Sequence, residues 1–172
     1  YGVVTNLSLV VTALFTGLAQ GAQPLISRAQ GQNRPDQARR LLRYGLFSVL
    51  GLSLFLYAIT ALAAGPIAVV FNSEGDPLLL EIAVQGLRLY FLGIGFAGWN
   101  ILFSIFFAAT EQALPAHLIS LSRGLFLILP MAFLMAWLGG TQGVWLTYPL
   151  TELLTLAMAA VLYRKKGQAT PT

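Results

Sequence analysis

Apolar residues run along this chain in long stretches that short polar segments separate. About 20 residues, at a helical rise of about 1.5 Å each, cross the roughly 30 Å of hydrocarbon in a bilayer. Five stretches reach that length, and the predicted spans are 5–27, 44–71, 82–110, 115–138 and 144–163. The pattern predicts an all-α integral membrane protein, a polytopic bundle of five transmembrane helices that forms one domain.

Composition supports this class and excludes others. Hydrophobic residues make up 57% of the chain and charged residues 9%, whereas about a quarter of the residues in a soluble domain are charged. The absence of cysteine excludes a disulfide framework, a thiolate nucleophile and a thiolate metal site. With a single histidine and no cysteine, a common transition-metal site is excluded too. We therefore expect no cofactor and no metal.

The positions of the charges predict an orientation. The loop 28–43, between the first two spans, carries five of the ten basic residues, and a further basic cluster follows the last span. Basic residues gather at the cytoplasmic ends of short membrane loops. Loop 28–43 and the carboxy-terminus are therefore predicted to be cytoplasmic, at the plasma (inner) membrane, and the acidic segment 72–77 external. Since topology accounts for the net charge of +4, nucleic acid is not an expected partner.

Exposing a polar side chain to lipid costs free energy, so polar side chains inside the spans are expected to face protein or a water-filled cleft. They are therefore candidates for function. Gln20 and Gln23 share one helix face, and they either line a cleft or bridge neighbouring helices. Glu152 is the one carboxylate deep in a predicted span. The candidates for lining a substrate cleft are Gln20, Gln23, Tyr90, Trp99, Asn100 and Glu152.

Other residues are candidates for structural roles. Glu152 is either a functional site or a structural residue, which pairs with Arg88 or with a polar group of a neighbouring helix. Without such a pair, Arg88 extends outward to the membrane surface. The glycine-rich third span is expected to pack closely against its neighbours or to bend. Trp145, Tyr148 and Tyr163 lie near span ends and predict an interfacial aromatic belt. The structural or charge-pair candidates are Arg88, Arg123, Glu111, Pro24 and Pro130.

Turn chemistry predicts two helix boundaries. Pro35-Asp36 ends the basic loop, and Gly65-Pro66 predicts a distortion near the far end of the second span. Asp76 is a predicted N-cap with Pro77 at the first helical position.

Four segments occur in order along the chain: GLAQGAQPLISRAQG, LRLYFLGIGFAG, SRGLFLILP and GGTQGVWLTYPLTELL. Together they resemble the carboxy-terminal half of a multidrug and toxic compound extrusion (MATE) transporter, over essentially the whole chain. The most specific parts are Gln23 to Gly31, and Gly143 to Trp145 with Pro149 and Glu152. The resemblance implies a twelve-helix transporter with two lobes, in which these spans correspond to helices eight to twelve and residues 1–172 to the carboxy-terminal lobe.

The resemblance also implies a function, a secondary active multidrug efflux antiporter that exports organic, often cationic, compounds in exchange for protons or sodium ions by alternating access. Some branches of the family place a coupling acid in the tenth helix, but the matching span 82–110 has no Asp or Glu. Ion coupling is then expected in the amino-terminal half, as in the DinF-like branch that this chain resembles more closely. The implied partners are the amino-terminal lobe, small organic substrates and the bilayer.

Alternatives stay open at the level of the sequence. Related folds act as flippases or exporters of a lipid-linked or polysaccharide precursor, and a non-transporting membrane scaffold would show the same spans. The sequence has no phosphate-binding loop motif and no local pair of carboxylates for acid and base chemistry, so we expect no enzyme. Because the chain begins without methionine or a basic leader, we expect it to be part of a longer protein.

Overall fold

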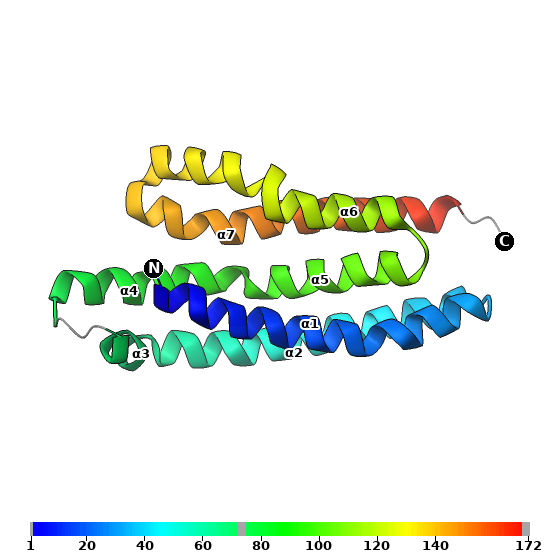
Figure 1. Ribbon diagram of the computed structural model, residues 1–172, viewed down its shortest axis with the longest axis horizontal. Helices are drawn as coiled ribbons and strands as arrows, with labels where there is room; N and C mark the ends of the chain where they lie inside the picture. The colour runs from blue at the N-terminus through cyan, green and yellow to red at the C-terminus, as the bar shows by residue number, and fades with distance from the viewer. Residues whose placement is uncertain (1, 72–74, 170–172) are drawn as a thin grey trace.

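The computed structural model describes residues 2–71 and 75–169, and for residues 3, 71 and 166–169 it describes the backbone alone. Glu74, in the predicted external loop, lies outside this range. All regular elements of the described residues are helical (Figure 1). They are α1 (Gly2–Gly31), α2 (Pro35–Leu62), α3 (Ala64–Phe71), α4 (Pro77–Tyr90), the 3-10 helix η1 (Phe91–Gly93), α5 (Ile94–Ala109), α6 (Ala113–Leu121), the π-helix η2 (Ser122–Phe126) and α7 (Ile128–Ala169).

Four helical stretches are long and apolar enough to cross a membrane: Val4–Gly31, Pro35–Leu62, Pro77–Ala109 and Ala113–Lys165. The last has 53 residues and holds two of the predicted spans. Its backbone leaves the helical conformation at Gly140 (φ 52°, ψ −133°), where the chain turns back on itself (Figure 1). A Cβ at Gly143 would overlap the carbonyl oxygen of Met135, so only glycine fits the turn. The predicted all-α membrane bundle with five transmembrane helices is confirmed.

Proline and aspartate set helix ends as the sequence predicts. Pro35 begins α2. The Asp76 carboxylate accepts a hydrogen bond from the Leu78 N–H at 2.8 Å and caps α4, with Pro77 at its first position. The second span is shorter than predicted, because α2 ends at Leu62 and the short α3 follows as a separate helix. The distortion expected at Gly65-Pro66 is therefore a break at Ala63.

The third predicted span forms one crossing, and η1 interrupts its α-helix near the middle. A Cβ at Gly86 would come within 2.7 Å of the Trp145 ring, and one at Gly93 within 2.7 Å of the Pro149 Cα atom. These two glycines let α4 and η1 approach α7 closely, as the glycine content predicts. Trp145 is only 4% exposed as a result, so its predicted place in an interfacial belt is wrong.

Helix α5 lies at the centre of the bundle and packs against α1, α2, α6 and α7. In Figure 1, α4 and α5 run between the α1–α2 pair and the hairpin of α6 and α7. The α1–α2 loop, the α5–α6 turn and the carboxy-terminal end of α7 all lie at one end of the bundle, on the right of Figure 1. We call this the basic end. It is defined by residues 28–43 and 162–165, whose basic members are Arg28, Arg34, Arg39, Arg40, Arg43, Arg164 and Lys165.

Candidate functional site

A polar cluster lies inside the bundle, where α5, η2 and α7 meet. Its centre is Glu152 on α7, whose side chain is 3% exposed. Nε and Nη2 of Arg123 donate hydrogen bonds to the Glu152 Oε1 atom at 3.0 Å and 2.7 Å. A carboxylate removed from water in this way requires a compensating charge, and the Arg123 guanidinium supplies it.

The second carboxylate oxygen of Glu152 is held by Asn100, which is completely buried on α5. The Asn100 Nδ2 atom donates to Glu152 Oε2 at 2.7 Å and to the Glu152 backbone carbonyl at 2.8 Å. Both carboxylate oxygens therefore accept hydrogen bonds, from two different helical elements. The cluster of Asn100, Arg123 and Glu152 ties the α6–α7 hairpin to the central helix.

The π-helix η2 positions the cationic member of this cluster. The Leu127 N–H donates to the Ser122 carbonyl at 2.9 Å, a bond one residue wider than in an α-helix. Pro130 has no N–H to offer the carbonyl of Phe126, four residues earlier, and so the α-helical pattern is broken here. Arg123 lies within this wider turn, and its guanidinium reaches Glu152 on α7. Pro130 thus lies in the first turn of α7, beside the distortion, and not within an uninterrupted helix.

The expected pairing of Glu152 with Arg88 is wrong. Arg88 is on α4 with its side chain exposed, and the carboxylate pairs with Arg123. Arg88 and Arg123 both lie within predicted spans, so the depth of each residue in the membrane, estimated from helical rise, does not choose between them as the partner of Glu152. The packing decides between them: Arg123 on η2 contacts Glu152, whereas Arg88 lies on the exposed face of α4. Pro130 is a signal in the sequence for the distortion that holds Arg123.

Two tyrosines continue the cluster toward α4. The rings of Tyr90 and Tyr148 stack with centroids 4.2 Å apart and an interplanar angle of 5°. Tyr148 precedes Glu152 by one helical turn and interacts electrostatically with Glu152 and Arg123. Tyr90 therefore reaches the cluster through Tyr148, a contact that the sequence did not predict.

The remaining candidates lie elsewhere. On α1, Gln20 is exposed and Gln23 half-buried, and Pro24 is an exposed residue within the same continuous helix. Trp99 donates from Nε1 to the Leu46 carbonyl at 3.0 Å and so bridges α5 to α2. Glu111 is exposed in the α5–α6 turn at a φ of 62°. None of these residues has a described hydrogen bond to Asn100, Arg123 or Glu152.

Comparison with known families and proteins agrees with this architecture. The MatE family model matches residues 1–135. The chain belongs to the MATE family of transporters. It is 29% identical over 154 residues to a protein named FAD transporter from Shewanella oneidensis, and the match covers 90% of this chain and 34% of that protein.

A solved structure shows the same fold. It is described as the outward-facing conformation of a multidrug resistance MATE family transporter of the MOP superfamily. The TM-score is 0.85 at 16% sequence identity, over 97% of this chain and 38% of that one. This MATE chain therefore spans between a third and two fifths of the length of these relatives.

Proposed function

We propose that this chain forms part of the carboxy-terminal lobe of a secondary active exporter, which moves organic compounds across the membrane in exchange for protons or sodium ions. Membership of the MATE family supports transport. Alternating access in such proteins is a movement of one bundle against another around a shared site. A lobe that serves this purpose has to move as one body.

The observation that carries the proposal is the buried cluster of Asn100, Arg123 and Glu152. It joins the α6–α7 hairpin to α5 through a carboxylate whose side chain is 3% exposed, and separating the helices would leave this buried charge without its partners. The ion pair is also neutral as a whole. This favours a rigid lobe, with the ion-coupling site placed in the amino-terminal half.

The substrate class has two candidates. Export of organic cations follows from the family resemblance, and the few arginines near the interior favour it, since Arg123 is already neutralised by Glu152. The 29% identity to the FAD transporter over 90% of this chain supports a dinucleotide substrate as the second candidate. A flippase of anionic lipid-linked precursors would require several unpaired arginines along the cleft.

A transport assay on the full-length protein tests the function. We expect proteoliposomes with an imposed proton or sodium gradient to accumulate a fluorescent organic cation, and an ionophore that collapses the gradient to abolish the accumulation. The same vesicles loaded with FAD distinguish the second candidate. Equal flux with and without either gradient would contradict the proposed exchange.

We also propose that the basic end faces the cytoplasm of a plasma (inner) membrane. The charge distribution supports this orientation. In intact cells, a cysteine at Arg34 should be protected from an impermeant thiol reagent, whereas one at Gln142, exposed near the turn at Gly140, should be labelled. Labelling at residue 34 from outside would reverse the orientation.

A further inference from the structure

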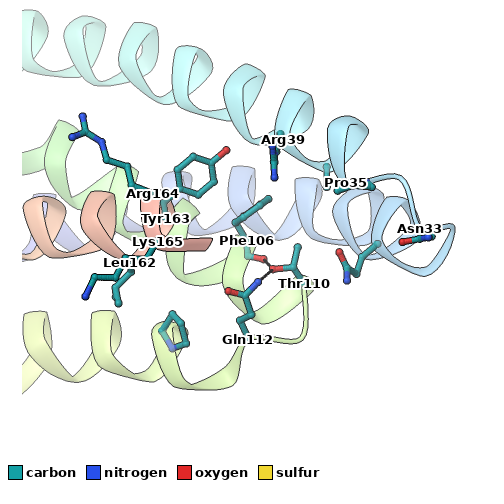
Figure 2. A pocket seen from close by; sticks show the side chains of 13 residues that line it. Asn33, Pro35, Arg39, Phe106, Thr110, Gln112, Leu162, Tyr163, Arg164 and Lys165 are labelled. Atoms are coloured by element: carbon teal, nitrogen blue, oxygen red, sulfur yellow. Dashed lines mark hydrogen bonds between the residues drawn. The ribbon is translucent and has the colours of Figure 1, made fainter. Parts of the chain in front are cut away.

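An open groove of about 730 Å³ lies along the start of α2, at the basic end of the bundle. All of its lining residues belong to the segment 33–44, which joins the α1–α2 loop to the first turns of α2. Figure 2 shows this segment at the tip of the α1–α2 hairpin, where Asn33 and Pro35 are labelled. The groove shares no lining residue with the cluster of Asn100, Arg123 and Glu152.

Two guanidinium groups, those of Arg34 and Arg40, line this one groove. Both side chains are exposed, and neither makes an ion pair with any acidic side chain that the structure describes. Asp36 lines the groove too, which leaves one positive charge in excess. Arg39 faces another way: it lines a second cavity, in which its side chain extends toward Phe106 (Figure 2). The excess charge of the groove attracts an anion.

An exposed apolar face continues from the groove along α2. Tyr44, which lines the groove, and Phe47, which follows it, are each 66% exposed. Arg40, Tyr44 and Phe47 are four and then three residues apart, so they share one face of the helix. Helical rise separates Arg40 from Phe47 by about 10 Å, whereas one head-group layer of a bilayer is only about 6 Å deep. When Arg40 lies at the level of the phosphates, Phe47 therefore lies in the hydrocarbon.

The composition of this face favours lipid over another helix as its neighbour. Farther along α2, large apolar side chains are exposed, among them Leu54, Phe55 and Ile59. The exposed residues of α1 include Gly17 and Gln20 instead. Small and polar residues are typical of contacts between membrane helices, whereas large apolar side chains are satisfied by acyl chains. The two exposed faces therefore differ in the neighbour that they fit.

We propose that the groove and the adjoining face of α2 bind an anionic phospholipid. Its phosphate lies against Arg34 and Arg40, whose guanidinium groups can each bind phosphate oxygens in a bidentate manner. Its acyl chains lie along the face that begins at Phe47. Asp36 accepts hydrogen bonds from head-group hydroxyls such as those of phosphatidylglycerol. A head group with one net negative charge matches the excess charge of the groove, and this proposal does not depend on what the transporter exports.

Native mass spectrometry of the delipidated full-length protein, titrated with phosphatidylglycerol in detergent, tests the site. We expect the first lipid to bind about tenfold more tightly than phosphatidylcholine or phosphatidylethanolamine with the same acyl chains. Arg40→Gln should weaken phosphatidylglycerol binding about fivefold to tenfold, and Arg40→Lys should weaken it less. The matched control is Arg164→Gln, an exposed residue of α7 at the same end of the bundle that does not line the groove. This variant should change the affinity by less than about twofold.

The soluble head group sn-glycerol 3-phosphate should bind at least about tenfold more weakly than the lipid, because it has no acyl chains to bury. Equally tight binding of this compound would identify a soluble phosphate as the ligand and overturn the proposal. Equal affinity for phosphatidylglycerol and phosphatidylcholine, or equal weakening by Arg40→Gln and Arg164→Gln, would overturn it as well. So would absence of bound phosphatidylglycerol, because another part of the transporter would then cover this face. If Arg40→Gln is not monodisperse, Arg34→Gln carries the same expectation, since its exposed side chain takes no part in the backbone hydrogen bonds of the loop.

Discussion

Arginine is used in opposite ways in two regions of this molecule. In the cluster at α5, η2 and α7, Arg123 makes two hydrogen bonds to a carboxylate that is almost completely removed from solvent. At the basic end, Arg39, Arg40 and Arg43 extend from α2 without an ion pair to any described acid. The first arginine is required by the fold. The others are available to lipid, to solvent or to a ligand, and the same substitution should therefore have very different effects in the two regions.

The largest effect is expected for Arg123→Gln. This change leaves the buried Glu152 carboxylate without a counter-charge and should lower the free energy of unfolding by about 3–5 kcal/mol. An unfolding titration of the full-length protein in sodium dodecyl sulfate measures it. Adding Glu152→Gln to that variant should recover part of the loss, whereas adding Arg88→Gln should recover none. A loss from Arg88→Gln alone as large as that from Arg123→Gln would restore the pairing that the structure contradicts.

A smaller loss is expected for Asn100→Ala. The substitution removes the donor to Glu152 Oε2 but keeps the arginine, so a buried acceptor loses one of its hydrogen bonds. The expected cost is about 1–3 kcal/mol. The control is Ser48→Ala, an exposed polar position on α2, which should be close to neutral in the same titration. A neutral Asn100→Ala would mean that the carboxylate finds another donor.

A comparable or slightly smaller loss is expected for Gly93→Ala, which places a Cβ within 2.7 Å of the Pro149 Cα atom. Backbone cannot move aside as a long side chain can, so overpacking should cost about 1–3 kcal/mol. At Gly17, an added Cβ meets no atom within 4 Å. Gly17→Ala should be neutral or stabilise its helix by up to about 1 kcal/mol. Equal effects at the two glycines would remove the evidence for close packing of η1 against α7.

Much of the fold follows from the sequence alone. Hydropathy gives the five crossings, because no other arrangement of such apolar stretches satisfies the backbone in lipid. Asp76 and Pro77 predict their helix start by local chemistry. The glycines of α4, η1 and α5 predict close contacts, although not which partner they meet. Trp145 shows what the sequence does not predict. Its position near a span end favours the membrane interface, but the side chain is buried in the space that Gly86 leaves open.

The cluster was only half predictable, for a physical reason. Asn100, Arg123 and Glu152 are each recognisable as polar residues in apolar surroundings. Their mutual contact depends on how α5, η2 and α7 are turned about their axes, and this has no hydropathy signature. An angular change of this kind redirects a long side chain from one neighbouring helix to another. Periodicity can therefore identify the members of a buried site before it can identify their pairs.

The smallest effect is expected for Arg43→Gln, which makes the same chemical change as Arg123→Gln at the basic end. The Arg43 side chain is exposed and has no ion pair with a described acid. Its charge is solvated in both the folded and unfolded states, so the free energy of unfolding should change by no more than about 0.5 kcal/mol. The sodium dodecyl sulfate titration used for Arg123→Gln measures both variants under identical conditions. A loss at Arg43 as large as that at Arg123 would show that charge at the basic end is structural, and the contrast between the two regions would then be wrong.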